Sequence, residues 1–162
     1  MKPIPRGAKG SFNLLVQPEH LANRFKDATL PPVLATPVMI MAMENAALNA
    51  VRPYLDPGES AVGTAVNVRH LAATPAGRLV TAEAEATKIE GRQIEFIVRA
   101  SDGAKEIGTG SHSRVVIDMA KFTRRLGRAN AVWLEADNSR RQTAAACRCQ
   151  TKFERAREIT DL

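Results

Sequence analysis

The chain has 162 residues, of which 44% are hydrophobic and 25% are charged, a composition typical of one globular domain rather than of a disordered segment. No apolar run approaches the ~20 residues that span a bilayer, and the N-terminus lacks the apolar region of a secretory signal. We therefore expect a cytoplasmic protein that does not bind membranes. The net charge of +6 attracts anions, but the basic residues are scattered and dense only at 121–128, so we do not expect nucleic-acid binding.

The chain ahead of residue 36 predicts little regular structure. Residues 11–17 (S-F-N-L-L-V-Q) favour a first strand, and residues 18–26 are compatible with a short helix. Residues 27–35 contain two adjacent prolines, which break a helix and cannot donate to a sheet, so this segment is expected to be a loop.

A long apolar helix is expected over residues 36–51. Thr36 is a favourable N-cap, Pro37 suits the first turn because its missing N–H would be unpaired there, and Pro53 ends the helix. Almost every face of the segment is apolar, which predicts a helix that is buried all round. Glu44 is the exception, and because an unpaired buried carboxylate costs several kcal/mol, we expect it to have a partner and a function.

Beyond the helix the hydrophobic period changes to two, which predicts strands. In the first of them, Val62 and His70 fall on one face, with the valines toward the core, and Gly63 falls on the other. Short strands joined by tight turns form an antiparallel meander, so we predict an α+β fold in which one antiparallel sheet wraps around a central helix. The expected strands lie at residues 62–70, 78–89, 93–100 and 105–118.

The periodicity weakens toward the C-terminus. Residues 119–126 favour a short closing helix, and residues 129–162 mix charges and alanines without a sustained pattern. We therefore expect one domain over residues 1–128 and an appended, mobile tail. Cys147 and Cys149 are too few for a metal site and poorly spaced for an internal disulfide, so they indicate a reducing compartment.

Four segments resemble a known enzyme family. They are L-A-T-P-V-M-I-M-A-M-E-N-A-A, R-P-Y-L-D-P-G-E-S-A-V-G-T, V-R-H-L-A-A-T-P-A-G and G-T-G-S-H-S-R-V-V-I-D. Over residues 11–126, the chain is similar to the hotdog-fold acyl-CoA thioesterases related to fluoroacetyl-CoA thioesterase. The resemblance implies a hotdog fold, hydrolysis of an acyl-CoA substrate and no cofactor. A single sheet of this kind leaves free edges and a half-open pocket, so we also expect a homodimer.

The resemblance also implies roles for individual residues. In that family a threonine, a glutamate and a histidine act on the thioester, and these match Thr36, Glu44 and His70. The glycine before the histidine matches Gly63, and a late arginine matches Arg114, a candidate for the coenzyme phosphates. Free backbone N–H groups at the start of the helix would stabilise the thioester oxygen. Either His70 activates water or relays protons, or Glu44 attacks directly and forms an anhydride, and both routes stay open.

The segment ahead of the helix is expected to line the acyl pocket through Leu30, Val33 and Leu34. The fluoroacetyl-specific member of the family is thought to shield its pocket with phenylalanines in this region, whereas this chain has none there. A hydrophobic pocket discriminates weakly between chain lengths, so we expect a short to medium acyl group rather than a dedicated fluoroacetyl site.

Two other functions are compatible with the same fold. A non-catalytic module that binds acyl-CoA or another small ligand is the main alternative, and it would have no need of Glu44 together with His70. A hotdog dehydratase or hydratase ranks third, because such enzymes use an Asp–His pair in a D-x-x-x-x-H pattern that is not found ahead of a helix here. His20 and His112 match no family role and are interpreted as structural or surface residues.

Overall fold

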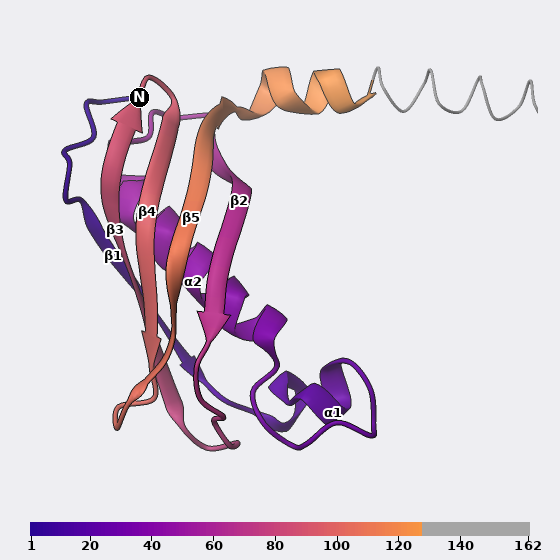
Figure 1. Cartoon of the computed structure of the whole chain (residues 1–162). Helices are drawn as coiled ribbons and strands as arrows, with labels where there is room; N and C mark the ends of the chain where they lie inside the picture. Colours follow the sequence, from indigo (N-terminus) through magenta and orange to yellow (C-terminus); the bar gives the residue numbers. More distant parts are fainter. Residues whose placement is uncertain (128–162) are drawn as a thin grey trace, which may run out of the picture. The chain divides into compact units, whose positions relative to one another are not determined.

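The computed structural model describes residues 1–127 (Figure 1). The chain divides into two compact units, Met1–Met119 and Ala120–Leu162. The tail expected at 129–162, with its two cysteines, lies outside the described residues. The elements are β1 (Lys9–Leu15), η1 (Pro18–His20), α1 (Ala22–Phe25), α2 (Thr36–Val51), η2 (Arg52–Tyr54), β2 (Glu59–His70), β3 (Leu79–Glu90), β4 (Gln93–Ser101) and β5 (Glu106–Asp118), followed by a helix at 119–127.

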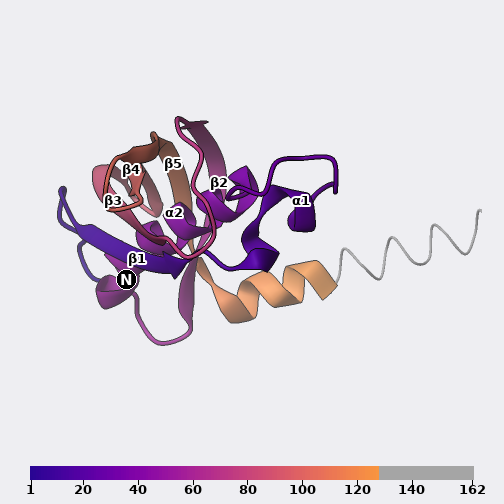
Figure 2. The ribbon, with the colours of Figure 1, turned by 90° about the horizontal axis from the view of Figure 1, so that it is seen from below.

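The five strands form one antiparallel sheet in the order β1-β3-β4-β5-β2. The sheet curls around α2, which crosses its concave side (Figures 1 and 2). This arrangement confirms the prediction of an α+β fold with one antiparallel sheet around a central helix. Strands β1 and β2 are the two edges, so each presents a row of backbone groups that no other described strand pairs.

Small residues allow α2 to lie close to the sheet. A Cβ on Gly10 of β1 would stand 2.2 Å from the backbone nitrogen of Ala50 and 2.4 Å from the backbone oxygen of Ala46, so only glycine fits at this position. The helix packs chiefly against β1 and β3, and less against β2 and β5. The concave side of the sheet near β2 therefore keeps room for polar side chains.

The prediction that the long helix is buried all round is wrong. Met41 is 37% exposed, and the side chain of Glu44 is 39% exposed. The reason is the off-centre position of α2, which covers the β1 side of the sheet and turns one stripe toward the free β2 edge. Neither α2 nor any other helix of residues 1–127 is long and apolar enough to cross a membrane.

A β-bulge between Gly63 and Ala65 corrects the predicted faces of β2. His70 pairs in register with Gly108, and Gly63 pairs with Arg114. Both β5 partners face α2, because a Cβ on Gly108 would meet Met39 and the Arg114 side chain contacts the helix backbone. Gly63 and His70 therefore share the concave face. A bulge inserts one residue and reverses the alternation, so strict period-two counting placed Gly63 on the wrong side.

Candidate active site

Thr36 and His70 form a hydrogen-bonded pair at the N-terminal end of α2. Oγ1 of Thr36 lies 2.9 Å from Nδ1 of His70, the last residue of β2. The N-cap of the helix is Ala35, and no side chain caps this end. The predicted capping role of Thr36 is therefore wrong: its hydroxyl is engaged by the imidazole instead of by a helix N–H.

The environment of His70 favours a neutral imidazole. Burial lowers the pKa of His70 below its ordinary value, and the nearby backbone of Ala72 opposes this shift only in part. The ring can therefore accept a proton at neutral pH. Its Nε2 atom is buried and has no hydrogen-bond partner within residues 1–127. Buried polar atoms are seldom unpaired, so this nitrogen marks a position that a bound group would complete.

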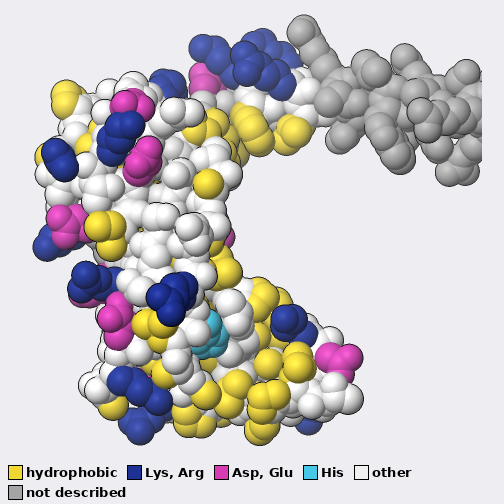
Figure 3. All heavy atoms as spheres, in the orientation of Figure 1, with side chains coloured by type: hydrophobic (Ala, Val, Ile, Leu, Met, Phe, Trp, Pro, Cys, Tyr) yellow, Lys and Arg dark blue, Asp and Glu magenta, His cyan; other side chains and the backbone are white. Residues whose placement is uncertain are grey.

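A hollow of about 400 Å³ is lined by Thr36 and His70, and we refer to it as the Thr36–His70 hollow. The structure places all three predicted acyl-pocket residues, Leu30, Val33 and Leu34, on this hollow. Hydrophobic side chains also gather at the surface around the segment that carries α1 (Figure 3). The hollow thus combines a polar pair with an aliphatic wall, a composition typical of sites that bind small molecules.

Glu44 lies in a second hollow, the Glu44 hollow, which has a volume of about 300 Å³ and is lined by Gly63 and Arg114 among others. A Cβ on Gly63 would stand 2.7 Å from Oε1 of Glu44, so the missing side chain provides the space that the carboxylate occupies. The carboxylate accepts no hydrogen bond from the described residues, and its partial exposure to water replaces the partner that full burial would demand.

Arg114 lines the Glu44 hollow and connects α2 to β2 through hydrogen bonds. Its Nη1 donates to the backbone oxygen of Glu44 at 3.0 Å, and its Nη2 donates to the backbone oxygen of Ala61. Burial lowers the pKa of the guanidinium, and the negative charge of Glu44 opposes that shift. Because Arg114 is only 7% exposed, it offers little surface to a coenzyme phosphate, and its observed contacts hold two elements together.

His112 is a site residue that the sequence reasoning missed. It is 2% exposed, and its Nε2 lies 3.9 Å from Oε1 of Glu44 and 3.1 Å from Nη1 of Arg114. The signal was the H-S-R spacing, since residues two apart on a strand share a face and Arg114 was already a candidate. Of the two predicted alternatives, structural or surface, the structure therefore excludes a surface position for His112.

The two hollows are separate within one chain. Thr36 and Glu44 are eight residues apart on α2, which corresponds to about 12 Å of helix. The structure brings Thr36 to His70 and brings Glu44 to Gly63 and Arg114. No hydrogen bond or ion pair joins Glu44 to His70 in the described part of the chain.

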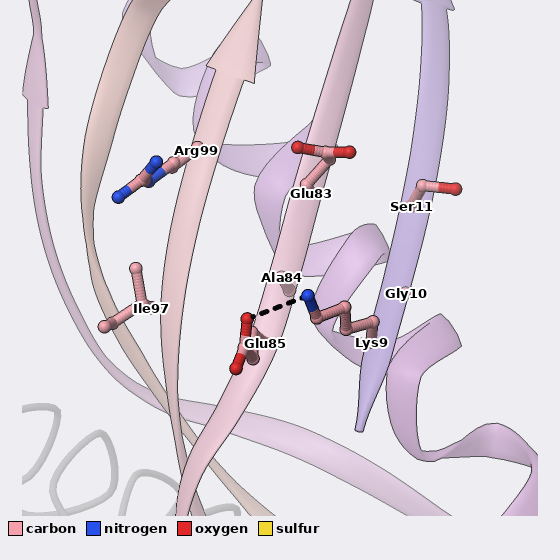
Figure 4. A pocket seen from close by; sticks show the side chains of 8 residues that line it. All are labelled: Lys9, Gly10, Ser11, Glu83, Ala84, Glu85, Ile97 and Arg99. Atoms are coloured by element: carbon pink, nitrogen blue, oxygen red, sulfur yellow. Dashed lines mark ion pairs between the residues drawn. The ribbon is translucent and has the colours of Figure 1, made fainter. Parts of the chain in front are cut away.

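A hollow larger than either of these two lies over β1, β3 and β4 (Figure 4). Its volume is about 540 Å³, and its walls carry Lys9, Glu85, Glu83 and Arg99. Lys9 and Glu85 form an ion pair at 3.3 Å, but both side chains are at least half exposed, and exposed pairs contribute little. This hollow contains neither a histidine nor a hydroxyl–imidazole pair, so its size alone does not make it the reactive site.

Comparisons with known proteins identify the family of this chain. A family model described as fluoroacetyl-CoA-specific thioesterase matches residues 16–120. The fluoroacetyl-CoA thioesterase of Streptantibioticus cattleyicolor is 50% identical over 95 residues, which are 59% of this chain and 68% of that protein.

Solved structures show the same relationship. One structure of fluoroacetyl-CoA thioesterase has a TM-score of 0.74 and 38% identity, and the match covers 78% of this chain and 98% of the other. A thioesterase superfamily member from Thermus thermophilus has a TM-score of 0.77 and 33% identity, over 83% of this chain and 99% of the other. The fold is therefore the hotdog fold, and the chain belongs to the fluoroacetyl-CoA-specific thioesterase family.

Proposed function

We propose that this chain hydrolyses short to medium acyl-CoA thioesters in the cytoplasm, with no cofactor beyond the coenzyme A of its substrate. The observation that carries the proposal is the Thr36–His70 pair, whose hydroxyl and neutral imidazole line a hollow with an aliphatic wall. A hydrolase needs a base beside the acyl carbon, and a binding module does not. Membership of a thioesterase family supports the same reaction.

His70 is proposed as the base, with Thr36 setting the orientation of its ring. The unpaired Nε2 atom would take a proton from the attacking water or give one to the departing thiolate. The backbone N–H groups at the start of α2 would stabilise the thioester oxygen as its charge grows. Glu44 either assists the water or attacks the carbonyl as a nucleophile, and both routes need its carboxylate near the thioester.

A homodimer through the β2 edge would bring the two hollows together. The middle of β2 is exposed, including Val66 at 42%. If two β2 strands pair antiparallel about a twofold axis at Asn67, so that this residue faces its own copy, then the bulge that begins at Gly63 lies opposite His70 of the partner subunit. Because Glu44 lies over Gly63, this register would place its carboxylate beside the partner's imidazole. The catalytic groups Thr36, Glu44 and His70 would then form one site from two chains.

A thiol-release assay with a panel of acyl-CoA substrates tests the proposal. We expect turnover of acetyl-, butyryl- and hexanoyl-CoA. Saturable binding without thiol release at every chain length would support the alternative function, a non-catalytic acyl-CoA binding module.

A further inference from the structure

His112 occupies a fixed position in the middle of β5. Its ring stacks on Phe96, its register partner on β4, with ring centroids 6.3 Å apart and planes inclined by 28°. Nδ1 lies 2.8 Å from the backbone oxygen of Ala65, which follows the β2 bulge. The imidazole is thus held by one neighbouring strand through stacking and by the other through a hydrogen bond.

These contacts determine the tautomer of His112. A carbonyl oxygen only accepts hydrogen bonds, so Nδ1 must carry the proton toward Ala65. Burial lowers the pKa of His112, and the nearby guanidinium of Arg114 adds to the effect, while the Ala65 bond and Glu44 oppose it. The ring is therefore neutral at pH 7, and the lone pair on Nε2 accepts the Nη1–H of Arg114 at 3.1 Å.

The bond from Arg114 to His112 affects Glu44. Nη1 of Arg114 also donates to the backbone oxygen of Glu44, so His112 and the helix share one donor group. Nε2 of His112 accepts a hydrogen bond from Arg114 and therefore carries no proton of its own. It cannot donate a hydrogen bond to the Glu44 carboxylate, which lies 3.9 Å away. The charged groups that face His112 are Glu44 from α2 and Arg114 from β5. The helix backbone at Glu44 is thus fixed beside β5, while the carboxylate itself accepts no hydrogen bond from residues 1–127.

We propose that His112 is a positioning residue for thioester hydrolysis, which holds Arg114 and the β2 bulge so that Glu44 projects over Gly63. The proposal rests on the function proposed above. It differs from a purely structural role in one respect: replacing His112 should lower kcat only when Glu44 is present.

A double-mutant cycle tests this dependence. His112→Phe keeps the stacking on Phe96 and removes both polar contacts, and we expect it to lower kcat about 10- to 100-fold with little change in KM, the scale of a lost hydrogen bond to a charged group. In a Glu44→Gln background the same change should lower kcat no further. His20→Phe, which changes a histidine remote from Glu44, serves as the matched control and should keep wild-type kcat.

Each outcome has a defined meaning. An active wild type with kcat unchanged in folded His112→Phe overturns the positioning role alone, and so does an equal loss of kcat in the wild-type and Glu44→Gln backgrounds. Absence of thiol release by the wild type overturns the proposed function first. If His112→Phe does not fold, His112→Asn takes its place, because the shorter amide cannot reach both Ala65 and Arg114. The same expectations apply to it.

Discussion

The carboxylate of Glu44 stands against the backbone of Gly63, where a single added methyl group would lie 2.7 Å from Oε1. The same methyl group would lie 3.0 Å from Cε1 of His112. The first of these neighbours is the far end of a flexible side chain and can move at small energetic cost. It is also the group to which we assign the chemistry. Stability and activity should therefore respond differently to a change at this glycine.

We expect Gly63→Ala to lower kcat about tenfold or more and to change the melting temperature by only a few degrees, because the flexible carboxylate can move away and the His112 ring need shift only slightly. Steady-state kinetics and thermal unfolding of the same preparation check this. Gly127→Ala is a matched control, since a Cβ there has open space around it. Unchanged turnover in Gly63→Ala would show that the position of Glu44 is not critical.

The proposed dimer makes a prediction about mixed chains. Glu44→Gln and His70→Ala should each lower kcat by at least ~10²-fold with the fold intact. When the two inactive variants are mixed and allowed to exchange subunits, the heterodimer should regain one complete site, with Glu44 from one chain and His70 from the other. Recovery approaching one quarter of wild-type activity is expected after full exchange, because about half of the dimers are mixed and each has one of two sites.

Two results would contradict this arrangement. A monomer in analytical ultracentrifugation that is fully active would show that the dimer is not needed for activity. An inactive mixture in which subunit exchange is demonstrated would show that Glu44 and His70 of the same chain act together. Mixing either variant with itself is the control, and it should recover nothing.

The hydroxyl of Thr36 gives a third prediction. Thr36→Ala should lower kcat about tenfold through the lost bond to His70, a smaller loss than in the Glu44 and His70 variants. Thr36→Ser keeps the hydroxyl and should keep most of the activity. Because Thr36 does not cap α2, the alanine variant should not show the loss of ~1 kcal/mol that a removed cap causes. Equal activity of the alanine and serine variants would argue against a role for the hydroxyl.

The sequence predicted the elements more accurately than their faces. Proline, glycine and the change of period determined where α2 and the strands begin and end, because these signals are local. The bulge after Gly63 and the off-centre position of α2 arise from pairing and packing over long distances, and no local pattern reports them. The sequence indicated Thr36, Glu44 and His70 as site residues. It did not predict their division between two hollows, because that division also depends on long-range packing.

His112 was overlooked for a related physical reason. Its importance depends on which neighbours occupy its two ring nitrogens. The spacing on β5 indicates Arg114, but Ala65 is known only from the register of β2 against β5. A histidine in a polar-looking strand segment, T-G-S-H-S-R, is compatible with either a structural or a surface position. In the fold it is among the most deeply buried polar side chains.

The lowered pKa of His70 predicts the pH dependence. Its folded pKa lies below the ordinary value of about 6.5, so the neutral base persists at a pH where a free histidine is half protonated. The acid limb of kcat/KM should therefore fall below pH 6.5. Between the two pKa values the unfolded chain binds the extra proton, so this group also makes the fold less stable as the pH drops through that range. A kcat/KM profile with an acid limb above 6.5 would exclude His70 as the base.

The last prediction concerns the acyl group. The Thr36–His70 hollow is walled by Leu30, Val33 and Leu34 and has no Phe, Tyr or Trp among the residues that line it. An aliphatic wall does not strongly reject acyl chains of a different length, because one methylene group changes the free energy of recognition by only ~1–3 kcal/mol. We therefore expect kcat/KM for acetyl- and fluoroacetyl-CoA to agree within about tenfold, and butyryl- and hexanoyl-CoA to be accepted as well.

Leu30→Phe provides the corresponding gain-of-bulk test. A phenyl ring at this position would narrow the hollow, so kcat/KM should fall more for hexanoyl-CoA than for acetyl-CoA, while thermal stability stays close to that of the wild type because Leu30 is not fully buried. Met119→Phe, a change at an exposed hydrophobic residue away from the hollow, is the control for added bulk. A several hundredfold preference of the wild type for fluoroacetyl- over acetyl-CoA would contradict this prediction. It would show that such selectivity does not need aromatic side chains ahead of α2 and would indicate the polar groups around His70 and Glu44 as its origin.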